Sequence, residues 1–218
     1  MYRLLFEKKG RAVWISHLDL MRLFQRAFKR AGYSLTHSHG FNPRPSVSIA
    51  LPLSVGVASD CEFLDFSLDD ESPSCEEIQN KLNSVLVDGI KVRNVYSDGR
   101  KIRDIAFLQC QIILQYDAAL NTADLNAVKD LFESSEVFVE KKSKNGTQDI
   151  NIIPMIRKIS FTGDTDHIYI DATVCCQNPS LNPMLIISAI DRNLPQLTPS
   201  YYQCIRTEIY DCNDNIFR

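Results

Sequence analysis

The clearest secondary-structure pattern in the sequence is SHLDLMRLFQRAFKRAG, residues 16–32. Its apolar residues recur at three- and four-residue steps, the spacing that places them on one face of an α-helix. Ser16 suits the N-cap, Asp19 stands where a carboxylate accepts backbone N–H groups, and Gly32 suits the C-terminal end. We therefore predict an amphipathic helix from residue 16 to about residue 31, with one face in the core.

Strand and helix patterns surround this helix in the first half of the chain. The expected elements are a strand at 2–7, the helix, strands at 46–51 and 61–68, a helix at 75–86 and a strand at 90–95. An apolar run at 12–15 extends the first strand or pairs back on it, and 35–39 is a further short strand candidate. The order β, α, β, β, α, β is typical of a ferredoxin-like unit, with two helices on one face of an antiparallel sheet.

The second half repeats this order after a polar, basic stretch at residues 97–104. Its expected elements are strands at 106–116, 137–142, 148–153, 167–175 and 202–209 and helices at 123–134 and 184–191, while extended residues at 155–161 blur the pattern. We expect an α+β protein built from tandem ferredoxin-like (βαββαβ) halves with antiparallel sheets, residues 1–100 and 101–218. Element order alone supports the tandem, because the halves share no residue-level repeat.

Composition indicates a globular, cytoplasmic protein. Apolar residues make up 44% and charged residues 23% of the chain, which is ordinary globular usage. No apolar run approaches the ~20 residues that span a bilayer, and the charged N-terminus does not resemble a signal peptide, so no membrane association is expected. The seven cysteines are odd in number and scattered, the pattern of reduced thiols.

Charge is distributed unevenly along the chain. The net charge is −3, yet the first fifty residues hold nine Lys or Arg against two acids, a balance of +7, which leaves −10 for the rest. This asymmetry favours a cationic surface that meets a polyanion such as RNA. The alternative is that the basic residues lie on separate exposed faces.

Several motifs near the N-terminus carry a resemblance to a known family. They are SHLDL at 16–20, GFNPRP at 40–45, LPL at 51–53 and Gly56, with weaker echoes at 149–154, at 181–183 and at Arg206. Together they look like the bacterial radical-SAM-linked protein family, whose domain is a separate chain or the C-terminal part of corrinoid-binding radical SAM proteins. The resemblance implies a radical SAM enzyme as a partner in trans. The chain lacks the C-x3-C-x-x-C spacing that holds the iron–sulfur cluster of such enzymes, and we expect no cofactor of its own.

A guanidinium stripe is the first candidate site. Arg22, Arg26 and Arg30 follow one another at i, i+4 spacing, and Lys29 flanks them. Like charges four apart on a helix repel, a cost that a bound phosphate backbone would offset. The alternative is an ordinary solvated helix face.

His17 and Asp19 stand in the first turn of the same helix. A neutral imidazole at His17 suits a general base, which makes His17 the one candidate catalytic residue. The alternative is that His17 only fixes local structure and that Asp19 is a capping residue.

The segment after the helix supplies further polar candidates. His37 and His39 would face the same side of a strand and could chelate zinc with Cys61, but zinc sites normally show paired ligands at short spacings, so we expect no metal. The rigid GFNPRP turn presents Asn42 and Arg44 for anion or RNA binding, and Phe41 either stacks on a base or fills the core. The expected polar pocket comprises His17, Asp19, His37, His39 and Phe41; the alternative is a structural turn.

The leading hypothesis is a non-catalytic accessory module that recognises RNA, or another polyanion, for a radical SAM enzyme. One alternative is a metal-independent RNA endonuclease of tandem ferredoxin-like type, with His17 working beside Arg44 or Arg22. Such nucleases use a C-terminal glycine-rich loop, whereas the last glycine here is Gly163. A second alternative is a protein-interaction scaffold that binds no nucleic acid. Asp149, before an apolar run, could complement the basic face or bind a cation.

Overall fold

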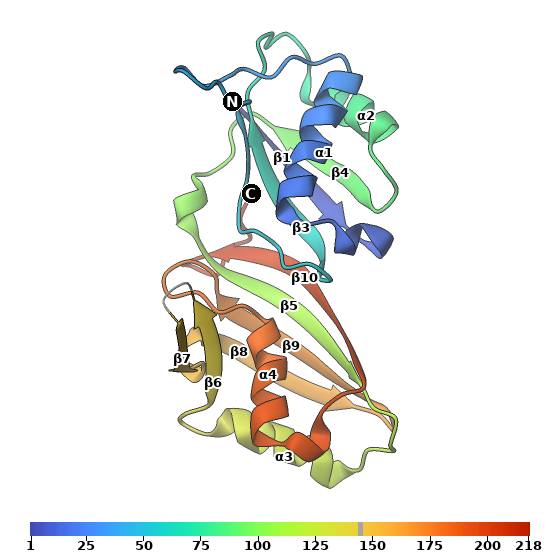
Figure 1. Cartoon of the computed structure of the whole chain (residues 1–218), viewed down its shortest axis with the longest axis vertical. Helices are drawn as coiled ribbons and strands as arrows, with labels where there is room; N and C mark the ends of the chain where they lie inside the picture. The colour runs from blue at the N-terminus through green and yellow to red at the C-terminus, as the bar shows by residue number, and fades with distance from the viewer. Residues whose placement is uncertain (144–145) are drawn as a thin grey trace. The chain divides into compact units, whose positions relative to one another are not determined.

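The computed structural model describes residues 1–143 and 146–218, and the chain divides into two compact units (Figure 1). The first unit comprises residues 1–104 together with Arg218, and the second comprises residues 105–217. The fold is mixed α and β, as expected: the described residues form four α-helices and strands that pair mostly antiparallel.

The first unit is a four-stranded sheet with two helices. Its elements are β1 (Tyr2–Lys8), the 3₁₀ helix η1 (Gly10–Trp14), α1 (His17–Arg30), β2 (Val47–Ile49), β3 (Ala58–Phe66), α2 (Cys75–Val85), β4 (Ile90–Tyr96) and η2 (Ile102–Asp104). The strands lie in the order β4-β1-β3-β2, and each neighbouring pair is antiparallel.

Both helices of the first unit pack on the same face of this sheet. Phe24 of α1 meets Phe6 of β1 edge to face at 4.8 Å, and the next inward turn brings Phe28 to 4.6 Å from Phe66. α2 adds Ile78 and Leu82 to the same buried cluster. The predicted cap is present as well, since the hydroxyl of Ser16 accepts a hydrogen bond from the backbone N–H of Asp19.

Two predicted strands of the first unit do not form as expected. The run at 12–15 lies in η1 and the residue after it, because the buried ammonium of Lys8 takes the carbonyls of Val13 and Ile15 as acceptors. Residues 35–39 make only isolated bridges, Leu35 with Leu68 and His37 with Pro45. Proline has no N–H to continue a ladder there.

The second unit is also a four-stranded sheet with two helices, and it carries an additional hairpin. Its elements are β5 (Ile105–Gln115), α3 (Thr122–Glu133), β6 (Phe138–Ser143), β7 (Gly146–Asn151), η3 (Ile153–Met155), β8 (Ile156–Gly163), β9 (His167–Cys175), α4 (Met184–Asn193), η4 (Pro195–Leu197) and β10 (Tyr201–Asp211). The sheet order is β10-β5-β9-β8, and among the described residues β6 and β7 form a separate two-stranded sheet.

The extended residues that blurred the sequence pattern turn out to be a strand of this sheet. Residues 156–163 form β8, which pairs along β9, whereas the segments expected at 137–142 and 148–153 pair only with each other. Phe161 of β8 packs against Phe132 of α3, with ring centroids 5.3 Å apart. β7 is polar and largely exposed, so it has little apolar surface to offer a sheet face.

All seven cysteines carry free thiols, and four of them, Cys61, Cys110, Cys176 and Cys204, are buried. Burial raises the pKa of the Cys176 thiol to about 12. The Cys176 side chain therefore behaves as a small apolar group of the core. Among the helices that the structure describes, none is long and apolar enough to cross a membrane.

Candidate functional site

The outer face of α1 carries most of the predicted cationic stripe. Arg22, Arg26 and Lys29 are exposed, whereas Phe24 and Ala27 point into the core. This arrangement follows from helix geometry, because residues three and four apart share a face. The stripe therefore faces solvent along the helix.

Arg30, the last predicted member of the stripe, has a structural contact. Its Nη2 atom donates to the carbonyl oxygen of Val85 at 2.9 Å. Val85 is the last residue of α2, where a cation satisfies a free carbonyl and favours the negative helix end. Arg30 thus ties the two helices together.

Arg22 is also engaged, at the start of the helix. Its Nη1 atom lies 3.0 Å from Oδ1 of Asp19, and the Ser16 hydroxyl donates to the other carboxylate oxygen at 2.8 Å. The hydroxyl of Ser16, followed by Arg22, holds the pKa of the Asp19 carboxyl below its usual value. Both partners of the ion pair are largely exposed, so Arg22 can exchange this carboxylate for a phosphate at little cost.

The GFNPRP turn forms part of an exposed loop. The Ser38 N–H donates to the carbonyl oxygen of Arg44 at 2.8 Å, and the Arg44 N–H donates to Oγ of Ser38 at 3.0 Å. Phe41 is fully exposed, so it does not fill the core. The other predicted residues of this loop, His37, His39, Asn42 and Arg44, are exposed too.

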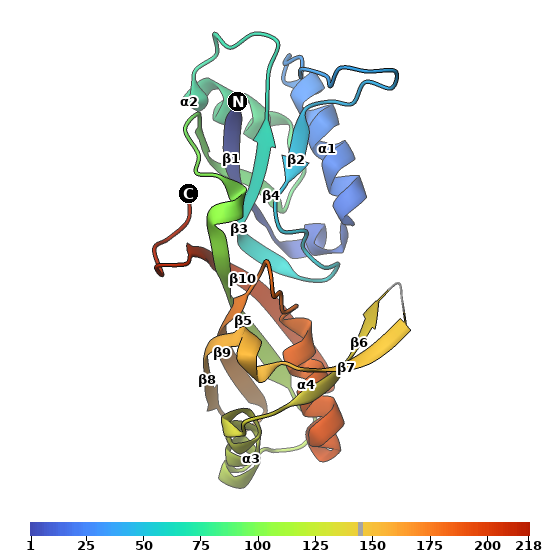
Figure 2. The same ribbon diagram turned by 90° about the vertical axis from the view of Figure 1, so that its left-hand side faces the viewer.

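The two groups of predicted pocket residues lie near opposite ends of α1 (Figures 1 and 2). His17 and Asp19 are in its first turn, beside the segment that Lys8 of β1 holds. The loop at 37–45 follows the other end, where the Thr36 N–H donates to the carbonyl oxygen of Ser67, the residue after β3. A helix of 14 residues is about 20 Å long. The structure therefore does not bring His17 together with His37, His39 or Phe41.

Two alternatives weighed from the sequence, a nuclease site with Arg44 and a zinc site with Cys61, also depend on where these residues lie. Arg44 lies in the loop and not beside His17, which leaves Arg22 as the nearer of the two cations considered for a nuclease. Cys61 is buried in β3, where its N–H bonds to Oγ of Ser59, whereas His37 and His39 are exposed. The described residues show one group of three potential metal ligands, and it lies elsewhere.

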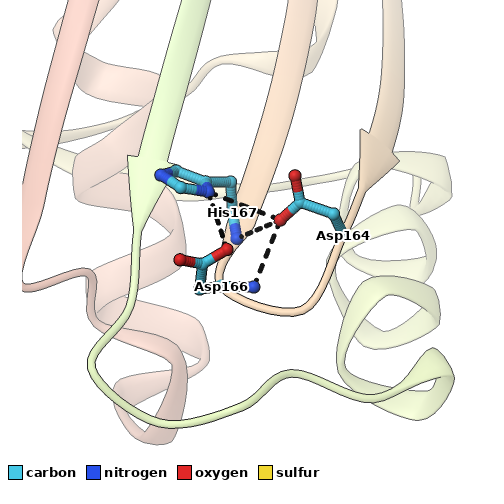
Figure 3. Close-up of side chains that lie close together, drawn as sticks. All are labelled: Asp164, Asp166 and His167. Carbon is cyan, nitrogen blue, oxygen red and sulfur yellow. Dashed lines mark hydrogen bonds and ion pairs between the residues drawn. The ribbon is translucent and has the colours of Figure 1, made fainter.

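That group is Asp164 and Asp166, in the turn between β8 and β9, and His167, the first residue of β9 (Figure 3). Oδ1 of Asp164 accepts the backbone N–H groups of Asp166 at 3.2 Å and His167 at 2.8 Å. Nδ1 of His167 lies 2.9 Å from Oδ1 of Asp166. The sequence analysis did not single out these residues, although aspartate before a hairpin reversal is a recognised turn signal.

The hydrogen bonds of Asp164 explain why these three side chains lie together, because they stabilise the hairpin turn. The N–H of Asp166 is the main cause that lowers the pKa of the Asp164 carboxyl to about 2, and the Tyr169 hydroxyl and the His167 N–H contribute. Oδ2 accepts from the Tyr169 hydroxyl at 3.0 Å. Both carboxylate oxygens thus already have partners within the hairpin.

Asp149 has a defined partner in the second unit. Its two carboxylate oxygens accept hydrogen bonds from Nη1 and Nη2 of Arg192 at 2.6 and 2.8 Å. Arg192 lowers the pKa of the Asp149 carboxyl. The contact joins β7 to α4, which is a structural use of the acidic residue that the sequence analysis left open.

Comparison with known proteins identifies a family. The model of a family described as "Uncharacterized protein conserved in bacteria (DUF2344)" matches residues 1–183. No curated protein matches the chain. A crystal structure of an unknown protein from Galdieria sulphuraria is similar at 10% identity with a TM-score of 0.27, covering 94% of this chain and 96% of that chain.

Proposed function

The chain belongs to the conserved bacterial family DUF2344, and we propose that it is a non-catalytic module that binds RNA, or another polyanion, through α1 and the loop at 37–45. In this proposal it presents the bound molecule to a radical SAM enzyme that acts in trans. The exposed outer face of α1, with Arg22, Arg26 and Lys29, is the observation that carries it.

The contacts of α1 support an anion site made of fewer residues than the predicted stripe. Arg30 is held by a carbonyl of α2, and Arg22 shares an exposed carboxylate. Arg26 and Lys29 point to solvent beside them. Guanidinium groups bind phosphate oxygens through two parallel hydrogen bonds, and the release of counterions from a phosphate backbone drives such binding.

The loop at 37–45 extends this surface beyond the C-terminal end of α1. Phe41 exposes its whole ring, and Arg44 and Asn42 are exposed beside it in sequence. An aromatic ring next to cationic and amide groups is the combination by which proteins stack on unpaired bases and bind their phosphates. Two prolines restrict the turn, so little conformational entropy is lost when it binds.

The finer fold proposal is that each unit is a variant of the ferredoxin-like fold. The first unit follows β1-α1-β2-β3-α2-β4 with strand order β4-β1-β3-β2. In the second, the order β10-β5-β9-β8 matches the same plan if the hairpin of β6 and β7 is an insertion before β8. Sheets with two helices on one face are common in RNA-binding proteins, although fold alone does not set function.

The radical SAM partner rests on the motifs SHLDL, GFNPRP and LPL of the first unit. We place the complex in the reducing cytoplasm, which suits seven free thiols. A tagged chain purified from a bacterium of the family should retain an iron–sulfur protein with a C-x3-C-x-x-C motif. If purification under anaerobic conditions yields no such protein, the partner part of the proposal fails.

Salt-dependent RNA binding tests the recognition part. Anisotropy of a labelled single-stranded RNA, titrated with protein between about 50 and 300 mM salt, should show affinity that falls steeply with salt. Arg26→Ala should weaken binding and reduce the salt slope by about one. Lys91→Ala is the matched control, because Lys91 is exposed on β4 and points away from the helix-covered face. No binding at about 50 mM salt would contradict the proposal.

The same RNA tests the nuclease alternative. If it stays intact over hours with the protein in EDTA, His17 does not act as the base of a metal-independent cleavage. Cleavage that disappears in His17→Ala would replace the recognition module with an enzyme.

A further inference from the structure

An apolar group is exposed at the start of α1, away from the loop at 37–45. The side chains of Trp14, Leu18 and Val55 are 69%, 66% and 53% exposed. Trp14 is the only tryptophan of the chain. Large aromatic side chains usually bury most of their surface, so an indole left this open is unusual.

Hydrogen bonds to the buried side of the chain fix the backbone on either side of Trp14. Lys8 is 1% exposed, and its ammonium donates to the carbonyl oxygens of Val13 at 3.1 Å and Ile15 at 2.9 Å, the residues on either side of Trp14. The N–H of Gly56 donates to the same Val13 carbonyl at 2.9 Å. A buried lysine is costly, and here its charge fixes the backbone beneath an exposed indole.

Gly56 also gives the indole its position. Its φ is +86°, and a Cβ at this residue would lie 3.3 Å from Cζ3 of Trp14. The ring therefore rests against a residue that has no side chain, while most of its surface remains open to solvent. The contact with Gly56 therefore restricts where the exposed ring can lie.

The electrostatic surroundings favour an anionic ligand. Leu18, Arg22 and Arg26 follow one another at four-residue spacing, so the Cα atoms of the two arginines lie about 6 and 12 Å further along the helix axis than that of Leu18. The guanidinium of Arg22 reaches back to the exposed carboxylate of Asp19. Arg11, in the same 3₁₀ turn as Trp14, is exposed as well. An apolar protein surface would not neutralise these cations. A nucleic acid strand supplies both a flat ring and regularly spaced negative charge.

We propose that Trp14 is a stacking platform for an unpaired base of single-stranded RNA or DNA whose backbone continues along Arg22 and Arg26. This inference rests on the proposed function and makes it more specific, because a cationic helix alone does not distinguish a nucleic acid from other polyanions. With Phe41 near the other end of α1, the strand would be held by an aromatic ring at each end. Duplexes, whose bases are already stacked, would bind less well.

Because Trp14 is the only tryptophan, its fluorescence reports directly on the platform. Titration with oligo(U) at about 50 mM salt should quench the emission to saturation. Heparin, a polyanion without bases, should compete with the oligonucleotide but leave the emission nearly unchanged. Trp14→Ala should weaken oligonucleotide binding about tenfold, the loss expected for one base stack, and should leave heparin binding unchanged. Trp14→Phe should recover most of the loss.

The outcomes separate this inference from the proposed function. If oligonucleotide and heparin both bind with steep salt dependence, and Trp14→Ala binds both as the wild type does, the platform is excluded and the cationic face stands. If neither polyanion binds, both proposals fail. Emission that changes only when a protein partner is added would also overturn the platform and assign the exposed group to protein docking. Because Trp14 is exposed, its variants should fold as the wild type does, and circular dichroism checks this.

Discussion

The ammonium of Lys8 lies 2.9 Å from the carbonyl oxygen of Ile15, the residue that leads into the N-cap of α1. This contact links the end of β1 to the start of the helix that carries the proposed binding face. Burial lowers the pKa of Lys8, and the charge of Glu62 opposes that effect. Lys8 therefore stabilises the connection between β1 and α1 in the first unit.

Replacement of Lys8 should destabilise the protein strongly. Lys8→Met removes the ammonium that donates to two backbone carbonyl oxygens, and with it the positive charge near the buried Glu62. It should reduce the free energy of unfolding by about 3 kcal/mol. Urea unfolding measures it. A second change, Glu62→Leu, should restore part of the loss in the double variant, since it also removes the buried carboxylate whose charge acts on Lys8. A loss below about 1 kcal/mol in Lys8→Met would show that the contact is dispensable.

Gly56 and Gly32 form a matched pair for testing the seat of Trp14. Both have positive φ, +86° and +82°, but only Gly56 would place a Cβ against the indole. Either glycine replaced by alanine should cost about 1 kcal/mol of stability from backbone strain alone. Only Gly56→Ala should also shift the emission of Trp14. Equal emission in both variants would mean that Gly56 does not position the ring.

The pair of Asp149 and Arg192 should control opening of the β6 and β7 hairpin. Arg192→Ala removes two hydrogen bonds between β7 and α4, so amide exchange in residues 146–151 should become faster. Since Arg192 lowers the folded pKa of Asp149, the contact is present at neutral pH and is lost as pH falls through that folded value. Arg157→Ala, which breaks a pair with Asp214 instead, is the control and should leave exchange in the hairpin unchanged.

The turn between β8 and β9 should be acid-sensitive through Asp164. Its folded pKa is about 2 against an ordinary value of 3.8, so the unfolded chain binds more protons between these values. The stabilising contribution of the carboxylate is therefore complete above about pH 4 and decreases as pH falls toward 2. Asp164→Asn keeps an oxygen acceptor without the charge. Its stability difference from the wild type should shrink between pH 5 and 2.5 in urea unfolding; a constant difference would rule out this role.

Local patterns predict some of these elements well and others poorly. α1 could be predicted with its cap because its apolar spacing, Ser16 and Gly32 all indicate the same helix. η1 could not, because it depends on the ammonium of Lys8, which reaches carbonyls five and seven residues away. β8 mixes polar and apolar residues, so its strand pattern is weak in the sequence. Its place in the sheet depends on partners in other elements, such as Phe132.

In the candidate site, too, local patterns predict some features and not others. Helical spacing predicts that Arg22 and Arg26 share an exposed face, and they do. The distance between His17 and the GFNPRP loop depends on where the chain runs after α1, which spacing does not encode. Trp14 was missed because a lone tryptophan in the apolar run at 12–15 suggests a core residue, whereas its side chain is 69% exposed.

Ultraviolet crosslinking of the intact protein to total cellular RNA, at about 50 and 300 mM salt, shows whether α1 and the loop at 37–45 bind RNA. We expect crosslinks that fade at the higher salt, that decrease in Arg26→Ala but not in Lys91→Ala, and that map to peptides containing Trp14 or Phe41. Absence of crosslinks at the lower salt, or crosslinks confined to residues 105–217, would contradict the proposed function.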